Sequence, residues 1–531
     1  MTLLGFVPIL QVNQPNERLN TLKTTILNIP HKATSPIKLW GRTAPDRPTT
    51  EVINVTIHKF YSITIVSIAV FYCNTIAQAQ GPVPLPATQS DDFLQFTSGH
   101  SGTASLEQLQ EQIDSQSEEI AELRSALTQK LDPGVSGATM KIVGRVHADY
   151  WAFPNTSPGV DALEGGHPQD RLGFRRVRFG VRGKLPVNME YRIEIEYAGG
   201  NNTEFRDAWL GWNDLPVLQK LLIGNQKRPY GLAHLNSSRY SVFLERPFVI
   251  ESFNQDCRRL GIQSWGFSED QSWNWRYGVF NQRLIQDEGN YTNDHLQLEV
   301  AARLANTIWY DKASDGRGYA HWAISGTTAY PDGSTGGDNG SVGPDQNEAR
   351  FRHRPEARSA SRWLDTGRIA GADNYQLLGL ESVLNVGPLQ LVGEYENVWL
   401  DRESGAGSDL HFHGGYVYAS YFLTGEHMPW NRKSGQLGRI QPFENFFLVR
   451  TCDGQCGKGI GAWQMAVRYS YADFNDVDIL GGIGESVTFG LNWFWTSNAR
   501  MQFNWIHGSI DNNSGNSGDY DIVGTRFMVD F

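Results

Sequence analysis

Most of the chain alternates between apolar and polar residues in short segments. In KIVGRVHADYW, residues 141–151, Ile142 and Val146 share one face while Arg145 and His147 take the other. The segments FRRVRFGVRGK and MEYRIEIEY alternate in the same way, with charged residues concentrated on one face. Because successive side chains of a strand point to opposite faces, each segment is predicted to be a strand with one apolar and one charged face.

Aromatic residues stand near the ends of these predicted strands, as in SVTFGLNWFWTSNARMQFNW. Aromatic residues make up 12% of the whole chain, which contains 16 Trp. A soluble sandwich seldom places so many aromatic residues on the faces and ends of its strands. A transmembrane barrel has aromatic girdles, an apolar outer band and a polar lumen. Its alternating strands register weakly on hydropathy plots, so the mean hydropathy of −0.41 does not exclude a membrane. We therefore predict an all-β transmembrane fold.

The C-terminal segment TRFMVDF also alternates, with Phe527, Val529 and Phe531 on one face. A last strand of this kind can pair with the first and so close a barrel without exposed edges. The 391 residues from Lys141 to the C-terminus provide about 24 residues per strand for 16 strands. This length fits a closed antiparallel transmembrane β-barrel of about that size over residues 140–531.

The N-terminal part contains a pattern typical of export. Residues 58–79 hold a basic start at Lys59, a short apolar core and Ala-Gln-Ala, which is the order found in a signal peptide. The apolar core is too short to span a bilayer as a helix. Residues 1–57 precede this signal, and either a start site assigned too early or a genuine long leader explains them. Residues 80–104 are rich in Pro, Gly and Ser and predict a flexible spacer.

Residues 105–131 carry the seam of a coiled coil. From Leu106 to Lys130 the seam positions step by three and four residues in turn, with Gln116 as a polar member, and LDPG ends the segment. A single amphipathic helix packed on its own domain is the alternative. We predict a periplasmic coiled coil that precedes the barrel.

Charge and cysteine content exclude several functions. The formal net charge is −11, and removing residues 1–79, with seven basic and three acidic residues, leaves −15, so no nucleic-acid partner is expected. Cys452 and Cys456 suit a small disulfide, whereas a lone C-x3-C without a second ligand pair is weak evidence for zinc. We find no G-x-S-x-G motif, and we expect no enzyme, cofactor or metal.

One basic cluster stands out against this acidic total. The segment EARFRHRPEAR, residues 348–358, holds Arg350, Arg352, Arg354 and Arg358. In a β-strand these four side chains would share one face and form a column. Like charges repel one another unless something anionic lies among them, so the column predicts contact with anions.

Several segments, in their order along the chain, resemble the phosphate-selective porins O and P of Gram-negative outer membranes. They include IVGRVHADY, FRRVRFGVRG, RDAWLGW, IGNQKRPYGLAHLNSSRYSVFLERP, LTGEHMPWNRKSGQLGRIQPFENF and GLNWFW. The resemblance implies a homotrimer of 16-stranded barrels in the outer-membrane lipid, each narrowed by an inward-folded loop. It implies passive diffusion of inorganic anions, phosphate or polyphosphate.

The resemblance also implies roles for particular residues. In the family a ladder of arginines leads anions along the pore wall to a basic constriction. Arg350, Arg352, Arg354 and Arg358 would be its rungs, with Arg145, Arg175 and Arg176 as further residues lining the pore. The constriction would hold His234, Ser237, Ser238, Arg239 and Arg246.

His234 departs from the family pattern, because a lysine is expected there. A histidine with a pKa near ~6.5 would supply a positive charge only at mild acidity. The departure predicts a general preference for anions in place of strict phosphate selectivity, with Arg239 as the residue that would compensate for the lost charge. Two alternatives stay open: a lumen wall whose arginines pair with acids such as Glu356, and a weakly selective porin whose coiled coil contacts the cell wall as a tether.

Overall fold

The computed structural model describes residues 137–531, apart from 200–202, 255, 286–295, 332–346, 451–455 and 513–514. The predicted leader, signal peptide, spacer and coiled coil all lie outside these residues. Cys452 does as well, while Cys456 is exposed.

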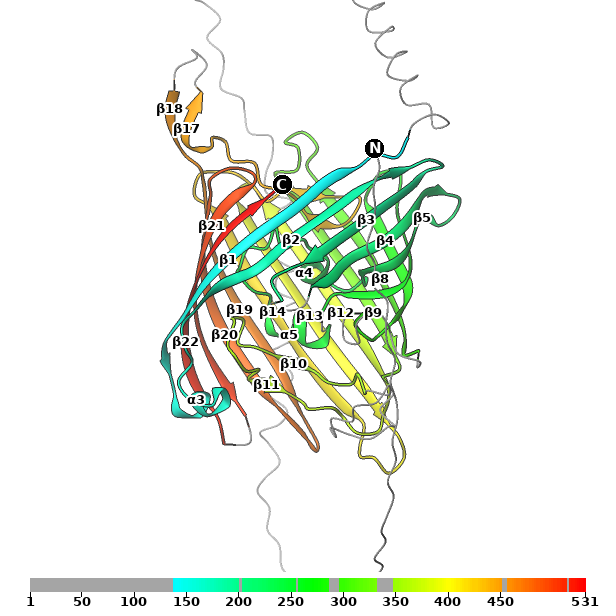
Figure 1. Cartoon of the computed structure of the whole chain (residues 1–531), viewed down its shortest axis with the longest axis vertical. Coiled ribbons are helices and arrows are strands. Elements are labelled where there is room, and N and C mark those ends of the chain that lie inside the picture. Colours follow the sequence, from blue (N-terminus) through cyan, green and yellow to red (C-terminus); the bar gives the residue numbers. More distant parts are fainter. Residues whose placement is uncertain are drawn as a thin grey trace, which may run out of the picture. The chain divides into compact units, whose positions relative to one another are not determined.

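Within the described part of the chain, 16 antiparallel strands form one closed barrel, which confirms the predicted fold (Figure 1). The strands are β1 (Lys141–Thr156), β2 (Arg171–Leu185), β3 (Met189–Glu196), β4 (Glu204–Leu215), β5 (Gln219–Lys227), β6 (Arg258–Phe267), β7 (Trp273–Asn281), β8 (Leu298–Tyr310), β9 (Gly318–Ala329), β12 (Ala372–Val386), β13 (Leu389–Arg402), β14 (Leu410–Phe422), β19 (Ala462–Asp476), β20 (Ile479–Phe494), β21 (Ala499–Asp511) and β22 (Gly518–Asp530).

The first and last strands close the barrel. β1 pairs with β22, so that Arg145 lies opposite Asp530 and Val146 opposite Val529. This pairing confirms the closure predicted from the C-terminal segment. It leaves no free edge that lipid would have to accommodate.

Alternation along each strand separates an inner from an outer face. On β14, Phe412, Tyr416 and Tyr418 are buried, whereas Val417 and Tyr421 on the other face are exposed. The inner side chains are covered by segments that fold into the barrel, and the outer ones form an apolar surface of the kind that faces lipid. The pattern of the sequence thus specifies which face is which.

The two ends of the barrel differ in their connections. At the terminal end, which holds Lys141 and Asp530, most turns are short, such as residues 186–188 and 216–218. The opposite end of the barrel, called here the loop end, has longer connections, which join β5 to β6 and β9 to β12. The smaller elements are α3 (Pro158–Glu164), α4 (Leu232–Leu235), α5 (Phe248–Phe253), β10 (Arg352–His353), β11 (Leu364–Asp365), β15 (Trp430–Asn431), β16 (Gln436–Leu437), β17 (Phe446–Arg450) and β18 (Cys456–Ile460).

None of the helices in the described segments is long and apolar enough to cross a membrane. Most turns at the terminal end are short, but the connection between β14 and β19 at that end is long. It contributes residues 431–439 to the inside of the barrel.

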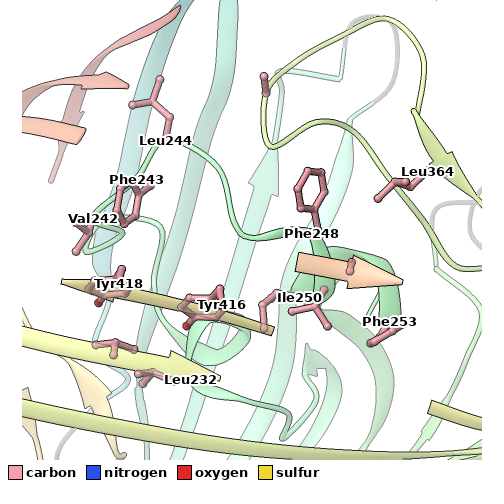
Figure 2. Close-up of a cluster of buried hydrophobic side chains, with 14 of the residues drawn as sticks. Leu232, Val242, Phe243, Leu244, Phe248, Ile250, Phe253, Leu364, Tyr416 and Tyr418 are labelled. Carbon is pink, nitrogen blue, oxygen red and sulfur yellow. The ribbon is translucent and has the colours of Figure 1, made fainter. Parts of the chain in front are cut away.

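The connection from β5 to β6, called here the 228–257 loop, folds into the barrel because it carries its own apolar side chains. Phe248 and Phe253 of α5 are buried together with Leu364 of the β9–β12 connection, near Tyr416 of β14 (Figure 2). Burying one such side chain stabilises the fold by about 1.5–3 kcal/mol. The loop is therefore held against the inner wall over several residues.

Candidate functional site

A cavity of about 960 Å³ lies inside the barrel. Its walls come from β1 to β7, from the 228–257 loop and from residues 352–362 of the β9–β12 connection, with residues 431–439 on another side. Sixteen arginines and two lysines line it, against six carboxylates. The acidic total of the chain therefore conceals a strongly basic interior.

A β-bulge places two consecutive arginines at this cavity. The pairing of β1 with β2 shifts register after His147, which lies opposite Arg176, so that Ala148 lies opposite Phe174 and Arg175 has no opposite residue. In a regular strand Arg175 and Arg176 would point to opposite faces. The extra residue of a bulge re-aims a side chain, and both arginines line the cavity.

The arginines of the barrel wall also hold the 228–257 loop. Arg145 donates from Nη1 to Ser238 Oγ at 2.9 Å and from Nη2 to both carboxylate oxygens of Glu194 at 3.1 Å. Arg175 makes a two-bonded contact with Glu245 of the loop, at 2.8 and 3.0 Å. These two arginines are thus anchors as well as lining residues.

Two predicted constriction arginines are tied to backbone and carboxylates. Arg239 donates to the carbonyl of Gly144 at 3.0 Å and forms an ion pair with Asp530 at 2.8 Å. Arg246 donates to the carbonyl of Ala233 at 2.8 Å and pairs with Glu251 at 2.9 Å. Ser237 and Ser238 line the same cavity.

His234 lies on α4 at the cavity but is only 1% exposed. Burial, followed by the charges of Arg228 and Arg246, holds the pKa of its imidazole well below the ordinary value of 6.5. Its ring meets that of Tyr230 edge-on at 5.1 Å between centroids. The expectation that His234 gains a charge at mild acidity is therefore wrong, because the site resists that proton.

The predicted strand over residues 348–358 is also wrong. This segment belongs to the connection between β9 and β12, and its only strand there is β10, which is two residues long. The connection folds into the barrel, and Arg352, Arg354 and Arg358 still line the cavity. Arg350 does not line it, and its guanidinium pairs with Asp365 at 2.7 Å. The arginines thus come together on a loop rather than on a barrel strand.

The cavity arginines of this loop are repelled by one another and by Arg175 of β2. Arg358 lies near Arg175, whose charge, together with burial, lowers the pKa of Arg358 to about 10. Burial and the charges of neighbouring arginines also lower the pKa of Arg352. Arg354 donates to the carbonyls of Ser359 and Ala360, at 2.9 and 3.3 Å.

The carboxylates of the cavity are fully used, whereas many of its arginines are not. All six lining carboxylates make ion pairs with arginines: Glu204, Asp207, Glu245, Glu251, Asp256 and Glu356. Among the residues with described positions, seven lining arginines make no ion pair: Arg176, Arg182, Arg276, Arg352, Arg354, Arg358 and Arg362.

Several of the lining cations were not among the predicted site residues. Arg178 and Arg182 follow Arg176 on the charged face of β2, so the alternation of the sequence already marked them. Arg276 and Arg439 stand alone in their segments, and no local pattern marked them. In the part of the chain that the structure describes, no cluster of three or more His, Cys, Asp or Glu side chains suits a metal ion.

A family model described as phosphate-selective porin O and P matches residues 140–531. Porin O of Pseudomonas aeruginosa is 24% identical over 432 residues, which cover 74% of this chain and 88% of that protein. A protein of Caulobacter vibrioides described as uncharacterized is 26% identical over 412 residues, 74% of each chain.

Two solved structures are similar to this chain at low identity. OmpT, an outer membrane protein of Vibrio cholerae in a trimer form, is 12% identical with a TM-score of 0.46, and 75% of this chain covers 100% of it. An anion-selective porin from Comamonas acidovorans is 14% identical with a TM-score of 0.44, and 74% of this chain covers 100% of it. Likenesses this distant decide nothing about the cavity.

Proposed function

Because the chain belongs to the phosphate-selective porin O and P family, and is located in the Gram-negative outer membrane, we propose that its barrel is a passive anion channel. One observation supports the proposal: within the described part of the chain, seven arginines at the cavity make no ion pair, while every lining carboxylate makes one. Fixed positive charge in a narrow, low-dielectric space raises the local concentration of anions and lowers that of cations.

Phosphate and polyphosphate are the proposed solutes. An arginine fork meets two oxygens of a phosphate at once, and its charge persists at physiological pH. Arg352, Arg354 and Arg358 lie within one loop at the cavity, so an entering polyanion can pass from one guanidinium to the next.

The proposal is tested by replacing Arg352, Arg354 and Arg358 together with alanine and measuring reversal potentials in a planar bilayer. The anion-to-cation permeability ratio should fall by about twofold or more at 0.1 M KCl, where charges act over ~10 Å. The difference should shrink at 1 M KCl, where the screening length is ~3 Å. If the arginines of this loop only support the fold, the variant and the unmodified protein should have the same permeability ratio at each salt concentration.

Arg350→Ala is the matched control. It removes the same type of side chain from the same loop, but Arg350 does not line the cavity and pairs with Asp365. Its permeability ratio should equal that of the unmodified protein. A triple variant that keeps its full anion preference at 0.1 M would contradict the proposed function.

Selectivity for phosphate is measured separately. Added phosphate should block chloride current at lower concentration than sulfate does, with both anions at a pH that gives them equal charge. Equal block by the two anions would leave a general anion porin in place of a phosphate-selective one.

A further inference from the structure

Glu356 occupies a sharp bend in the arginine-bearing segment of the β9–β12 connection. The amide of Glu356 donates to the carbonyl of Arg354 at 2.7 Å, which forms a three-residue turn centred on Pro355. Glu356 itself has φ of 54°, in the left-handed region that non-glycine residues seldom adopt. A conformation of this kind persists only where the surroundings hold it.

The side chain of Glu356 is 1% exposed and reaches three partners on three different elements. Its carboxylate accepts from the amide of Phe248 in the 228–257 loop at 2.9 Å. It also accepts from Ser486 Oγ of β20 at 2.9 Å and from Arg468 Nη2 of β19 at 2.6 Å. One carboxylate thus joins both inward loops to the barrel wall.

Arg468 completes the junction from the wall. Its Nη1 donates to the carbonyl of Glu245 in the 228–257 loop at 2.9 Å, and its guanidinium lies 4.5 Å from the ring centroid of Phe243. Arg468 is 2% exposed, so its charge depends on Glu356 for balance. Breaking a buried pair by removing one partner leaves the other charge uncompensated.

We propose that Glu356 and Arg468 are positioning residues, which lock the 228–257 loop and the arginine-bearing loop to β19 and β20 and so fix where the cavity arginines stand. Arg354, Glu356 and Arg358 all line the cavity, but the bend at Glu356 directs its carboxylate to Arg468 of the wall. The consequence for ion passage rests on the proposed anion channel. The locking of the two loops does not.

The locking is tested by labelling a cysteine placed at Ala357, which is 2% exposed beside the junction. All other cysteines of the full-length protein are first replaced by serine. In the folded barrel this site should react slowly with a small neutral maleimide. Glu356→Ala should speed labelling by about tenfold or more, the change expected when a charge-assisted hydrogen bond is lost from a two-state equilibrium.

Conservative variants separate positioning from general destabilisation. Glu356→Gln keeps an acceptor oxygen for Phe248 and Ser486 but loses the charge, so its labelling rate should lie between those of the parent and Glu356→Ala. Glu356→Ala and Arg468→Ala should not add, because each removes the same junction. Glu381→Gln is the matched control: Glu381 is a buried wall carboxylate paired with Arg303 and His321, with contacts to neither loop segment of the junction.

The same variants are then compared by reversal potential in the planar bilayer. Faster labelling with a lower anion preference supports both the locking and its role in ion passage. Faster labelling in a barrel whose unmodified form shows no anion preference would refute the proposed function and keep the locking. Unchanged labelling in both alanine variants, in barrels that migrate as folded on unheated gels, would overturn the inference.

Discussion

His234 shows how a basic cavity controls the charge of a single side chain. The imidazole is almost wholly buried, and Arg228 and Arg246 add to the effect of burial in lowering its pKa well below 6.5. Protonation of the imidazole would add a positive charge that the neighbouring arginines repel. The residue is expected to stay neutral over the range in which free histidine titrates.

The first prediction is that His234 does not make the pore sensitive to pH. The unmodified protein and His234→Gln should show superimposable sulfate permeability between about pH 7.5 and pH 5.5, a window that spans the ordinary histidine pKa of about 6.5. Sulfate serves because its charge is constant there. A rise in sulfate permeability on acidification that His234→Gln abolishes would show that His234 becomes protonated in this range and would contradict the prediction.

The same lowered pKa affects stability. Below about pH 6.5 the unfolded chain binds a proton at His234 that the folded chain rejects, so this residue contributes less stability as the pH falls. His234→Gln should therefore lose less thermal stability than the unmodified barrel between about pH 7 and pH 5. Melting midpoints from the heat-dependent gel shift measure the difference, and parallel losses in both proteins would disprove it.

Secondary-structure elements were predicted well where lipid and lumen impose alternation, and poorly where a segment leaves the barrel wall. The strands around Arg145 and Arg178 alternate because a slipped register would turn arginines into lipid. In the segment around Arg354, arginines also stand at alternate positions, but the segment is not a strand of the barrel wall. Pro355 and the left-handed backbone of Glu356 end the short strand β10. The charge spacing pointed to Arg352, Arg354 and Arg358, which line the cavity, but also to Arg350, which does not, and it assigned all four to the wrong kind of element.

The bulge in β2 supports a prediction about deletions. Removing Arg175 deletes the residue that has no opposite residue on β1, so His147 keeps Arg176 opposite and Ala148 keeps Phe174. The strands of the barrel should still pair, although one lining charge and the two-bonded contact with Glu245 are lost. Removing Val177, which pairs regularly with Val146, should turn Arg176 outward at a cost of about 2–4 kcal/mol near the membrane midplane.

The two deletions are compared by the yield of folded barrel on unheated gels after refolding into lipid. Deletion of Val177 should lower that yield markedly more than deletion of Arg175 does. Equal losses would show that the bulge is needed for folding and does more than re-aim Arg175.

At the scale of the whole molecule, the barrel was predictable because few architectures satisfy every backbone group in lipid. The cavity was only partly predictable, since Arg276 and Arg439 reach it through contacts between segments far apart in the chain. The coiled coil over residues 105–131 stays a prediction. A peptide of residues 104–133 should associate as a trimer, and a monomeric mass at high concentration would refute that.

Orientation in the membrane follows from the connections. Outer-membrane barrels place short turns in the periplasm and long loops outside the cell. Ser408 lies in a loop-end connection and Val187 in a short turn at the terminal end. A cysteine at Ser408 should react in intact cells with a maleimide reagent too large for the pore, whereas one at Val187 should react only after lysis. The reverse pattern would invert the orientation.

In the proposed anion channel, the seven lining arginines that make no ion pair among the described residues would act as a small fixed-charge ion exchanger. Seven such charges share about 960 Å³, which is about one charge for every four or five water volumes of ~30 Å³. Electroneutrality requires counterions in this space even when no solute is being carried. An arriving anion therefore displaces a resident one, and flux should depend on the mixture of anions present as well as on the gradient of any one of them.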